Sequence, residues 1–266
     1  MYSEISQADS VSHARPAGAY PNPPRGVWRA LRAVVAIALG WGFLAVFLTV
    51  ATTLTLLTFR FRSDRYFHLV ARVVGRTVLW LQGIDLRVDN AHRIDETRSQ
   101  ILIFNHTSQL DVFFFTAIMP KRCVVIVKRE MLWVPFIGLG VFAYRLQTID
   151  RQNLESAKRS MAKVAAYMQA NQCSVMLSPE GTRSKTEELG RFKKGAFHLA
   201  VATKAPILPI VVRGARSCQP MGKIVADPGL VVLDVLPEVD TTEFTTEQIS
   251  ARAEDMYQLF ARELAA

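Results

Sequence analysis

The longest uncharged stretch of the chain sets the first constraint on its fold. No charged residue appears between Arg32 and Arg60. As a helix, this run of roughly 27 residues would extend about 40 Å, more than the ~30 Å hydrocarbon core of a bilayer. It begins too far from Met1 to resemble a cleaved signal peptide, and no small-residue cleavage site follows it. We therefore predict a membrane-embedded helix that stays attached, and the alternative is a long buried helix of a soluble protein.

The flanks of this run do not fix its orientation. Residues 1–26 are polar and rich in proline, which predicts a disordered tail. Three arginines lie on each side of the run: Arg25, Arg29 and Arg32 before it, and Arg60, Arg62 and Arg65 after it. Because the positive-inside rule compares such flanks, it returns a tie here. A spanning helix and a re-entrant helical hairpin both remain open.

The next segment has the periodicity of an amphipathic helix. Its apolar residues recur at helical spacing: Phe67, Val70, Val73, Val74, Val78, Leu79 and Trp80. On a membrane surface, Arg65, Arg72 and Arg76 would lie toward phosphate headgroups. A helix packed into the protein core explains the pattern equally well. We assign residues 27–82 to a membrane-anchoring segment and residues 83–266 to one folded domain.

Short apolar runs alternate with helical patterns in this domain. The runs read as strands because they are short and rich in β-branched residues: Ile101–Phe104, Cys123–Val127, Cys173–Leu177, Ile207–Val212 and Leu230–Val235. Between them, the apolar stripe from Leu154 to Met168 predicts a core helix, and Thr246 and Glu247 open a terminal helix. Strands interleaved with helices predict an α/β fold with a mixed, mostly parallel sheet flanked by helices.

Composition narrows the classes of partner. A net charge of +9 and a pI near 9.7 fit a polyanionic partner, either nucleic acid or an anionic membrane surface. The basic residues are scattered and form no platform with aromatic residues, which argues against nucleic acid. Cys123, Cys173 and Cys218 lack metal-ligand spacing and are odd in number, so we expect reduced thiols facing the cytosol. We expect no metal and no nucleotide cofactor.

One heptapeptide carries the chemistry. Asn105 to Asp111 follows an apolar strand and places His106 and Asp111 across the predicted start of a helix. Ser108 reads as the helix N-cap, and Asp111 completes a variant of the capping box. A turn of this kind folds the carboxylate back onto a ring nitrogen, which leaves the other nitrogen free to take a proton. The alternative is a loop histidine beside an ordinary helix N-terminal carboxylate.

Further blocks follow in a fixed order. They are Lys128-Arg129-Glu130, Ile149-Asp150-Arg151, Ser178-Pro179-Glu180-Gly181-Thr182-Arg183, Phe192-Lys193-Lys194-Gly195 and Ala205-Pro206-Ile207-Leu208-Pro209. With the heptapeptide, they resemble the glycerolipid acyltransferase superfamily, most closely the 1-acyl-glycerol-3-phosphate (lysophosphatidic acid) acyltransferases, over about residues 75–215. Ser178 departs from the family pattern, which usually carries a bulky apolar residue there.

The resemblance implies acyl transfer from an acyl thioester to the free hydroxyl of a lysophospholipid. His106 would take the hydroxyl proton while Asp111 holds the imidazole, and no acyl-enzyme would form. The resemblance assigns acceptor binding to Glu180, Gly181, Thr182 and Arg183, although a solvated surface turn is the plainer interpretation of these residues in isolation. Arg151, Lys193 and Lys194 extend the cationic set, and Lys128 would lie near the donor carbonyl or its pantetheine arm. Each of these lysines is otherwise a solvated surface charge.

Several alternatives remain at this point. An acyltransferase for another lyso-lipid, such as lyso-ornithine lipid, would share the same chemistry. A non-catalytic membrane-anchored lipid-binding protein would explain the anchor and the charge, but not the motif blocks. The donor is either acyl-carrier protein or a coenzyme A thioester. We expect a protein embedded in the cell membrane, with its active site facing the cytoplasm. No Gly-x-Ser-x-Gly, Walker or His-Glu-x-x-His motif points to another enzyme class.

Overall fold

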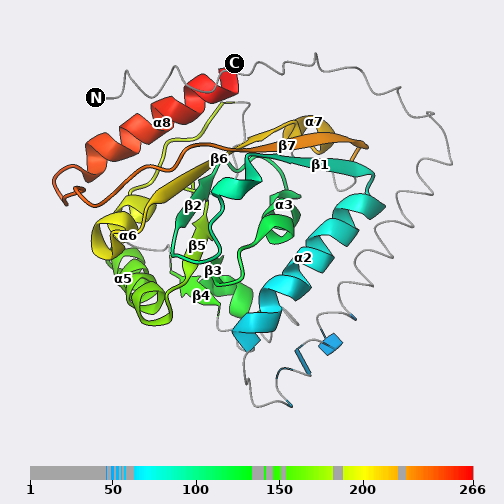
Figure 1. Ribbon diagram of the computed structural model, residues 1–266, viewed down its shortest axis with the longest axis horizontal. Coiled ribbons are helices and arrows are strands. Elements are labelled where there is room, and N and C mark those ends of the chain that lie inside the picture. Colours follow the sequence, from blue (N-terminus) through cyan, green and yellow to red (C-terminus); the bar gives the residue numbers. More distant parts are fainter. Residues whose placement is uncertain are drawn as a thin grey trace.

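The computed structural model describes residues 63–133, 146–150, 154–181, 188–220 and 226–265, with residue 141 and residues 46, 49, 50, 52, 53, 55 and 57 (Figure 1). The predicted tail and most of the uncharged run lie outside these residues. Within the part that is described, no helix combines the length and the apolar composition needed to cross a membrane. The membrane-embedded helix therefore stays a prediction.

One mixed sheet organises the described residues. Its strands lie in the order β1-β7-β6-β2-β5-β3-β4, and only the β6–β7 pair is antiparallel. The strands are β1 Ile84–Asp89, β2 Ile101–Phe104, β3 Cys123–Lys128, β4 Gln147–Ile149, β5 Ser174–Leu177, β6 Ile207–Arg213 and β7 Gly229–Val235. The predicted α/β fold with a mostly parallel sheet is confirmed. Because β2 to β6 run in one direction, their carboxyl ends meet at a single edge of the sheet, where ligands commonly bind in α/β folds.

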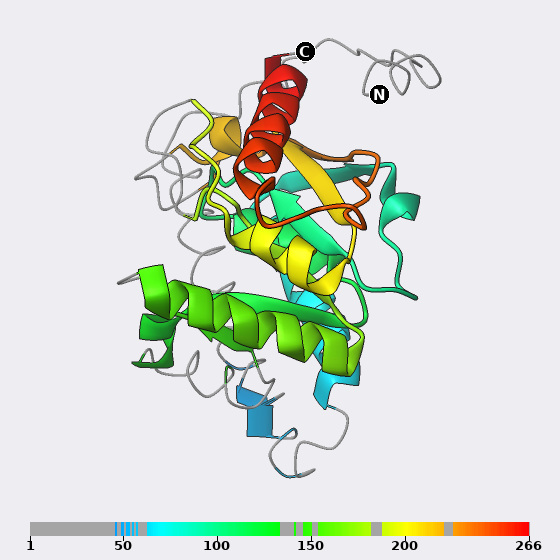
Figure 2. The ribbon, with the colours of Figure 1, turned by 90° about the vertical axis from the view of Figure 1, so that its left-hand side faces the viewer.

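Helices cover both faces of the sheet (Figures 1 and 2). One face packs against α2 (Ser63–Leu81), α3 (Asp111–Ile118) and α7 (Ala215–Cys218), and the other against α5 (Leu154–Asn171), α6 (Gly195–Thr203) and α8 (Ile249–Ala265). Two short 3-10 helices, η2 (Ala91–Arg93) and η3 (Arg129–Trp133), lie in connections. Alternate β2 residues enter the two cores: Ile101 and Ile103 on the α5 side, Leu102 and Phe104 on the α2 side.

Most of the predicted elements are confirmed, with three corrections. The strands β1 and β4 were not predicted, because β1 is a short alternating strand and β4 has only three residues. The terminal helix begins at Ile249, since Thr246 still belongs to the turn before it. The stripe that begins at Leu154 is confirmed as α5, with Met161, Val164 and Met168 buried.

Helix α2 packs tightly against α3. An ideal Cβ on Gly75 would lie 2.6 Å from the Phe113 carbonyl oxygen, so only glycine fits this crossing. Arg72 does not lie free for headgroups as expected, because its Nε donates to the Met119 carbonyl oxygen at 2.7 Å and its guanidinium pairs with Glu96. The buried face of α2 is therefore a core face, while its other face stays open to the surroundings.

Candidate functional site

The site begins where β2 ends. Asn105 is buried, and its side chain continues the β2–β6 ladder: Nδ2 donates to the Val212 carbonyl oxygen at 3.0 Å, and Oδ1 accepts from the Val212 amide at 2.8 Å. The Asn105 side chain thus bonds the amide and the carbonyl oxygen of Val212, which a further residue of β2 would otherwise pair with. This lets the chain leave the sheet at His106 without exposing unpaired polar groups.

His106 and Asp111 form the pair that the motif predicts. His106 Nδ1 donates to Asp111 Oδ2 at 2.5 Å, and Asp111 is 1% exposed while the imidazole remains partly open to solvent. The same carboxylate oxygen accepts from the amides of Thr107 at 2.7 Å and Ser108 at 2.9 Å. With Nδ1 committed to Asp111, Nε2 is the ring nitrogen available to take a proton.

The predicted helix cap is wrong in one respect. The helix begins at Asp111 with Leu110 as N-cap, and Ser108 lies before it in the turn. Ser108 Oγ accepts from the Leu110 amide at 3.1 Å and donates to the buried Gln219 at 3.0 Å. The hydroxyl therefore links the turn between His106 and Asp111 to the segment after α7. Nothing in the sequence near Gln219 signals this long-range contact.

A second buried carboxylate fixes the backbone of His106. Glu180 follows β5 and is 5% exposed. Its Oε1 accepts from the His106 amide at 2.7 Å, and its Oε2 accepts from the Gly190 amide at 2.8 Å. Both carboxylate oxygens are thus used by backbone donors. Asp111 orients the imidazole ring, and Glu180 holds the main chain from which that ring projects.

Gly190 belongs to the site although its sequence context shows no motif. An ideal Cβ at this position would lie 2.6 Å from Glu180 Oε2, so any side chain would displace the carboxylate. Gly181 lies on the other side of Glu180 with a φ of 71°, and a Cβ there would lie 2.9 Å from Lys193 Nζ. The Lys193 amide also donates to the Pro179 carbonyl oxygen at 2.7 Å. The loop before α6 is therefore closed onto the turn after β5.

The pKa of Glu180 differs from that of a surface carboxylate. Burial raises the pKa of Glu180, against the lowering effect of the His106 and Gly190 amides and of the nearby His106 ring, while Asp111 adds to the increase. A carboxylate held this way serves as a fixed hydrogen-bond acceptor. Its contacts support positioning, and acceptor binding by Glu180 stays a prediction.

The remaining predicted residues divide into two groups. Lys128 ends β3 and is exposed, and Lys193 and Lys194 are exposed beside the Glu180 turn. The strand register brings Lys128 level with Pro179 and Asn105, because Val124 and Ile101 both pair with Val175. The other group, Arg151, Thr182 and Arg183, lies outside the described residues, so its members stay predictions.

Ser178 is the residue that departs from the family pattern. It follows β5 on the sheet face covered by α2 and α3, since Met176 of the same strand enters that core. Its buried Oγ has no hydrogen-bond partner among the described residues. The serine occupies a place where a larger apolar residue would satisfy packing without an unpaired hydroxyl.

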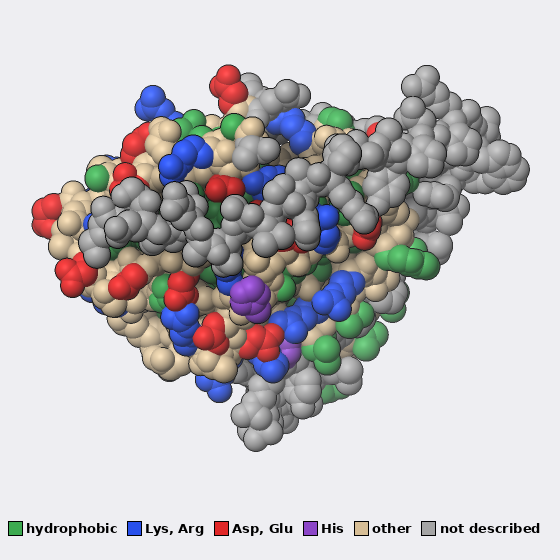
Figure 3. Space-filling model, turned by 45° about the horizontal axis from the view of Figure 1, so that its top comes forward, with side chains coloured by type: hydrophobic (Ala, Val, Ile, Leu, Met, Phe, Trp, Pro, Cys, Tyr) green, Lys and Arg blue, Asp and Glu red, His purple; other side chains and the backbone are tan. Residues whose placement is uncertain are grey.

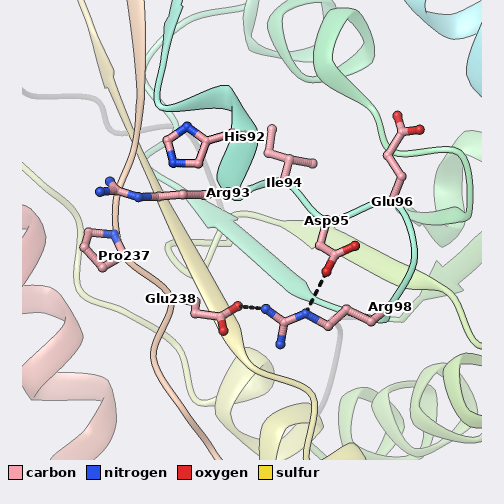
Figure 4. A pocket seen from close by; sticks show the side chains of 8 residues that line it. All are labelled: His92, Arg93, Ile94, Asp95, Glu96, Arg98, Pro237 and Glu238. Atoms are coloured by element: carbon pink, nitrogen blue, oxygen red, sulfur yellow. Dashed lines mark hydrogen bonds and ion pairs between the residues drawn. The ribbon is translucent and has the colours of Figure 1, made fainter.

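A hollow in the described residues lies away from the His106 turn. It holds about 520 Å³ and is lined by His92, Arg93, Ile94, Asp95, Glu96, Arg98, Pro237 and Glu238 (Figure 4). These residues precede β2 or follow β7, at the amino edge of the parallel strands. A second hollow of about 390 Å³ lies between η3, β4 and α5. Among the described residues, no group of His, Cys, Asp or Glu is arranged to hold a metal ion.

Comparison with known proteins gives a consistent result. Residues 85–213 match the acyltransferase family model. The 1-acyl-sn-glycerol-3-phosphate acyltransferase of Cocos nucifera is 31% identical over 211 residues, 79% of this chain and 68% of that protein. The corresponding enzyme of Limnanthes douglasii is 29% identical over 234 residues, 88% of this chain and 79% of that protein.

A solved structure shows the same fold. The crystal structure of the 1-acyl-sn-glycerophosphate (LPA) acyltransferase PlsC from Thermotoga maritima superposes with a TM-score of 0.73. The match covers 90% of this chain and 98% of that one at 22% identity. At this identity, the likeness concerns the fold, and the sequence comparisons carry the family assignment.

Proposed function

Because this chain belongs to the 1-acyl-sn-glycerol-3-phosphate acyltransferase family, we propose that its site moves a fatty acyl chain from a thioester to the free hydroxyl of 1-acyl-glycerol-3-phosphate, giving phosphatidic acid. One observation supports this most directly. The His106 imidazole is bonded through Nδ1 to a buried carboxylate at 2.5 Å, which leaves Nε2 as a base at the carboxyl edge of the sheet. That arrangement fits proton removal from a hydroxyl near neutral pH.

The reaction needs a base but no protein nucleophile. The acceptor oxygen attacks the thioester carbonyl carbon while His106 Nε2 takes the hydroxyl proton. When the tetrahedral intermediate collapses, the carbon–sulfur bond breaks and the thiolate leaves, taking its proton from the imidazolium. Asp111 stabilises the imidazolium that exists between these steps. Glu180 keeps the His106 backbone in place throughout, through the 2.7 Å bond to its amide.

A thiol-release assay with purified protein tests the acceptor. Lysophosphatidic acid and lyso-lipids without phosphate, lyso-ornithine lipid among them, are offered with a long-chain acyl thioester. We expect turnover with lysophosphatidic acid, and Arg183→Lys should weaken its use because lysine lacks the planar two-pronged contact. Robust acylation of a lyso-lipid without phosphate, with none of lysophosphatidic acid, would favour the alternative acceptor.

We propose further that the protein works at the cell membrane with its site toward the cytoplasm. The support comes from α2 and η3, where large apolar side chains are exposed: Leu69, Val73 and Trp80 on α2, and Leu132 and Trp133 on η3. Trp133 is 86% exposed and Trp80 is 74% exposed. Apolar side chains also gather toward the side of the molecule where α2 lies (Figure 3). Exposed apolar residues of this size typically mark a membrane or protein contact.

Membrane fractionation tests this attachment. Arginines placed in the run 33–59 should weaken retention on carbonate-washed membranes, since an arginine near the centre of a spanning helix costs about 2.5–3.5 kcal/mol on insertion scales. Deleting residues 1–24 serves as the control and should leave retention unchanged. A wild-type protein that washes off completely would contradict an embedded segment.

A further inference from the structure

Gln219 is a buried polar residue that the proposed reaction does not use. It follows α7 directly and is 3% exposed. Its Oε1 accepts from Ser108 Oγ at 3.0 Å, and Ser108 is equally buried. The Ser108 hydroxyl in turn accepts from the Leu110 amide at 3.1 Å. These bonds form a short buried chain from the N-cap of α3 to Gln219, and the bonds of such a chain strengthen one another.

Ser108 also touches the carboxylate that orients the base. Its amide donates to Asp111 Oδ2 at 2.9 Å, and His106 Nδ1 donates to the same oxygen at 2.5 Å. The Ser108 carbonyl oxygen accepts from the Asp111 amide at 3.5 Å. A shift of Ser108 would therefore move the oxygen that holds the imidazole. The path from Gln219 to the ring consists of Ser108 and Asp111.

The segment that carries Gln219 has little freedom to move. The Gln219 amide donates to the Ala215 carbonyl oxygen at 2.9 Å, and Ala215 is buried in the core that α7 shares with α3 (Figure 1). Helix α7 begins after Gly214, whose φ is 82° and whose added Cβ would lie 2.5 Å from the Leu230 carbonyl oxygen. Only glycine fits there, so the chain enters α7 along one path. Gln219 is thus a fixed point against which Ser108 is held.

The same stretch of chain holds the turn on both sides of His106. Before His106, the Asn105 side chain bonds the Val212 backbone at 2.8 and 3.0 Å. After His106, the Ser108 hydroxyl bonds Gln219. Both anchors belong to the unit of β6 and α7, so the turn is fixed at its two ends to one part of the fold. Such fixing matters for a base, because a small misplacement of reacting groups is costly in rate.

A second buried glutamine has the same kind of bonds at the other edge of the sheet. Gln100 is 0% exposed, its Oε1 accepts from the Asp95 amide at 2.8 Å, and its Nε2 donates to the Arg93 carbonyl oxygen at 3.1 Å. These bonds hold the loop before β2, whereas His106 lies after β2. The two glutamines are alike in burial and in bonding. They differ in which segment they hold, so Gln100 is the structural counterpart of Gln219.

Resting on the proposed function, we propose that Gln219 is a positioning residue of the acyl transfer. Through Ser108, it keeps the turn between His106 and Asp111 in the geometry that lets Nε2 take the acceptor proton. Gln219 lies beyond residues 85–213, which match the family model, and no motif of the site contains it. Because its contribution is to alignment, its loss should lower turnover and leave substrate binding intact.

The experiment compares Gln219→Leu with Gln100→Leu in the full-length protein, by thiol release with lysophosphatidic acid and a long-chain acyl thioester. Each change leaves a buried donor without its acceptor, so each should lower the thermal midpoint. Gln219→Leu should lower kcat about tenfold and keep KM within about twofold, because the base is misaligned while the substrate contacts remain. Gln100→Leu should keep both constants within about twofold of the wild type. Gln219→Met, which packs more adaptably, should give the same result if the leucine variant does not fold.

A double-mutant cycle and hydrogen exchange test the path through Ser108. Ser108→Ala also removes the acceptor of the Leu110 amide, so it should lower kcat at least as much as Gln219→Leu. The double variant should lose no more than Ser108→Ala alone, because both changes break the same bond. Hydrogen exchange, measured by mass spectrometry, should be faster in Gln219→Leu at the amides of Thr107, Ser108 and Leu110. Gln100→Leu should leave the exchange of this turn unchanged.

Three kinetic outcomes would overturn the positioning role. They are wild-type kcat in a folded Gln219 variant, an equal loss of kcat in Gln100→Leu, and multiplicative losses from Ser108→Ala and Gln219→Leu. Hydrogen exchange needs no substrate, so unchanged exchange of the turn in Gln219→Leu would overturn the link whichever lyso-lipid the enzyme uses. Inactivity of the wild type with every acceptor would instead contradict the proposed function, and the exchange result would still decide whether Gln219 holds the turn.

Discussion

The two edges of the sheet both hold acidic and basic residues, but these residues are paired differently. At the amino edge, charges neutralise one another. Arg98 bonds Asp95 at 3.0 Å and Glu238 at 2.6 Å (Figure 4). Glu96 bonds Lys121 at 2.8 Å as well as Arg72. Hydrogen bonds from Thr97 lower the pKa of Asp95 to about 2, and Lys121 and Arg72 lower the pKa of Glu96.

At the carboxyl edge, the buried carboxylates bond to the His106 ring and to backbone amides, and not to the cations. Asp111 and Glu180 accept from the His106 ring and from backbone amides, and burial raises the pKa of Glu180. Lys128 and Lys194 are left without an acidic partner among the described residues. The difference teaches that the larger hollow at the amino edge is a poor guide to function. Under the proposed function, the carboxyl edge is distinguished by carboxylates that fix geometry and by cations without an acidic partner among the described residues.

The largest expected effect comes from removing the base. His106→Ala should lower kcat by about 10²–10⁴-fold with either donor, because a correctly placed base typically contributes that much. Asp111→Asn should also lower kcat, since it leaves Nδ1 without its carboxylate. Thiol release at saturating substrate measures both, with circular dichroism to confirm folding. Near wild-type turnover of His106→Ala would show that His106 is not the base. It would also contradict a functional difference between the two edges of the sheet.

Much of this site was predictable because its signals are local. His106 and Asp111 are close in sequence, and the run Ile101–Phe104 before them reads as a strand without any structure. The link between Glu180 and the His106 amide spans 74 positions, and no periodicity reports such a contact. Gly190 was not predicted for the same reason. Glycine is required there because no space is left for a side chain beside Glu180, and the local sequence contains no motif.

The elements of the fold were also predictable only where their signals are local. Buried strands have continuous apolar sequences that sequence patterns detect, whereas β4 is a three-residue edge strand that acquires its conformation from pairing with β3. The outward face of α2 was ambiguous because core and membrane contacts favour the same residues. Packing against α3 determines the role of only the face that carries Gly75 and Leu79.

The second prediction concerns the link between Gly190 and His106. Gly190→Ala should lower kcat/KM on the order of 10–100-fold, because the new Cβ displaces Glu180 and shifts the base from its productive position. Gly195→Ala is the matched control, since its Cβ would meet Met161 Cε at an ordinary 3.4 Å.

A double-mutant cycle separates this link from general damage. If Gly190 acts through Glu180, then Gly190→Ala should add little to Glu180→Gln. The lost rate should appear in kcat more than in KM, because the base is misplaced while the substrate contacts remain. Multiplicative effects of the two changes would show that they act independently.

A third prediction uses the raised pKa of Glu180. A carboxyl group whose pKa is higher in the folded state binds its proton more tightly there, so its contribution to stability is greatest below the ordinary glutamate pKa. The free energy of unfolding should therefore fall as pH rises through the raised pKa. Glu180→Gln should lack this decline. Thermal midpoints in detergent across this pH range measure the difference, and parallel curves for the two proteins would contradict the raised pKa of Glu180.

The smallest expected effect comes from the amino edge. Arg98 is about half exposed and makes two ion pairs, and exposed ion pairs contribute roughly 0.2–1 kcal/mol each, so Arg98→Gln should lower the free energy of unfolding by about 2 kcal/mol at most. Turnover with both donors should be unchanged, because the pairs of Arg98 with Asp95 and Glu238 lie at the edge opposite His106. Chemical denaturation and the thiol-release assay, run on the same preparation, give the two quantities. A loss of turnover larger than twofold at unchanged stability would mean that the hollow around Arg98 takes part in the reaction, and the two edges would no longer divide into a structural and a functional one.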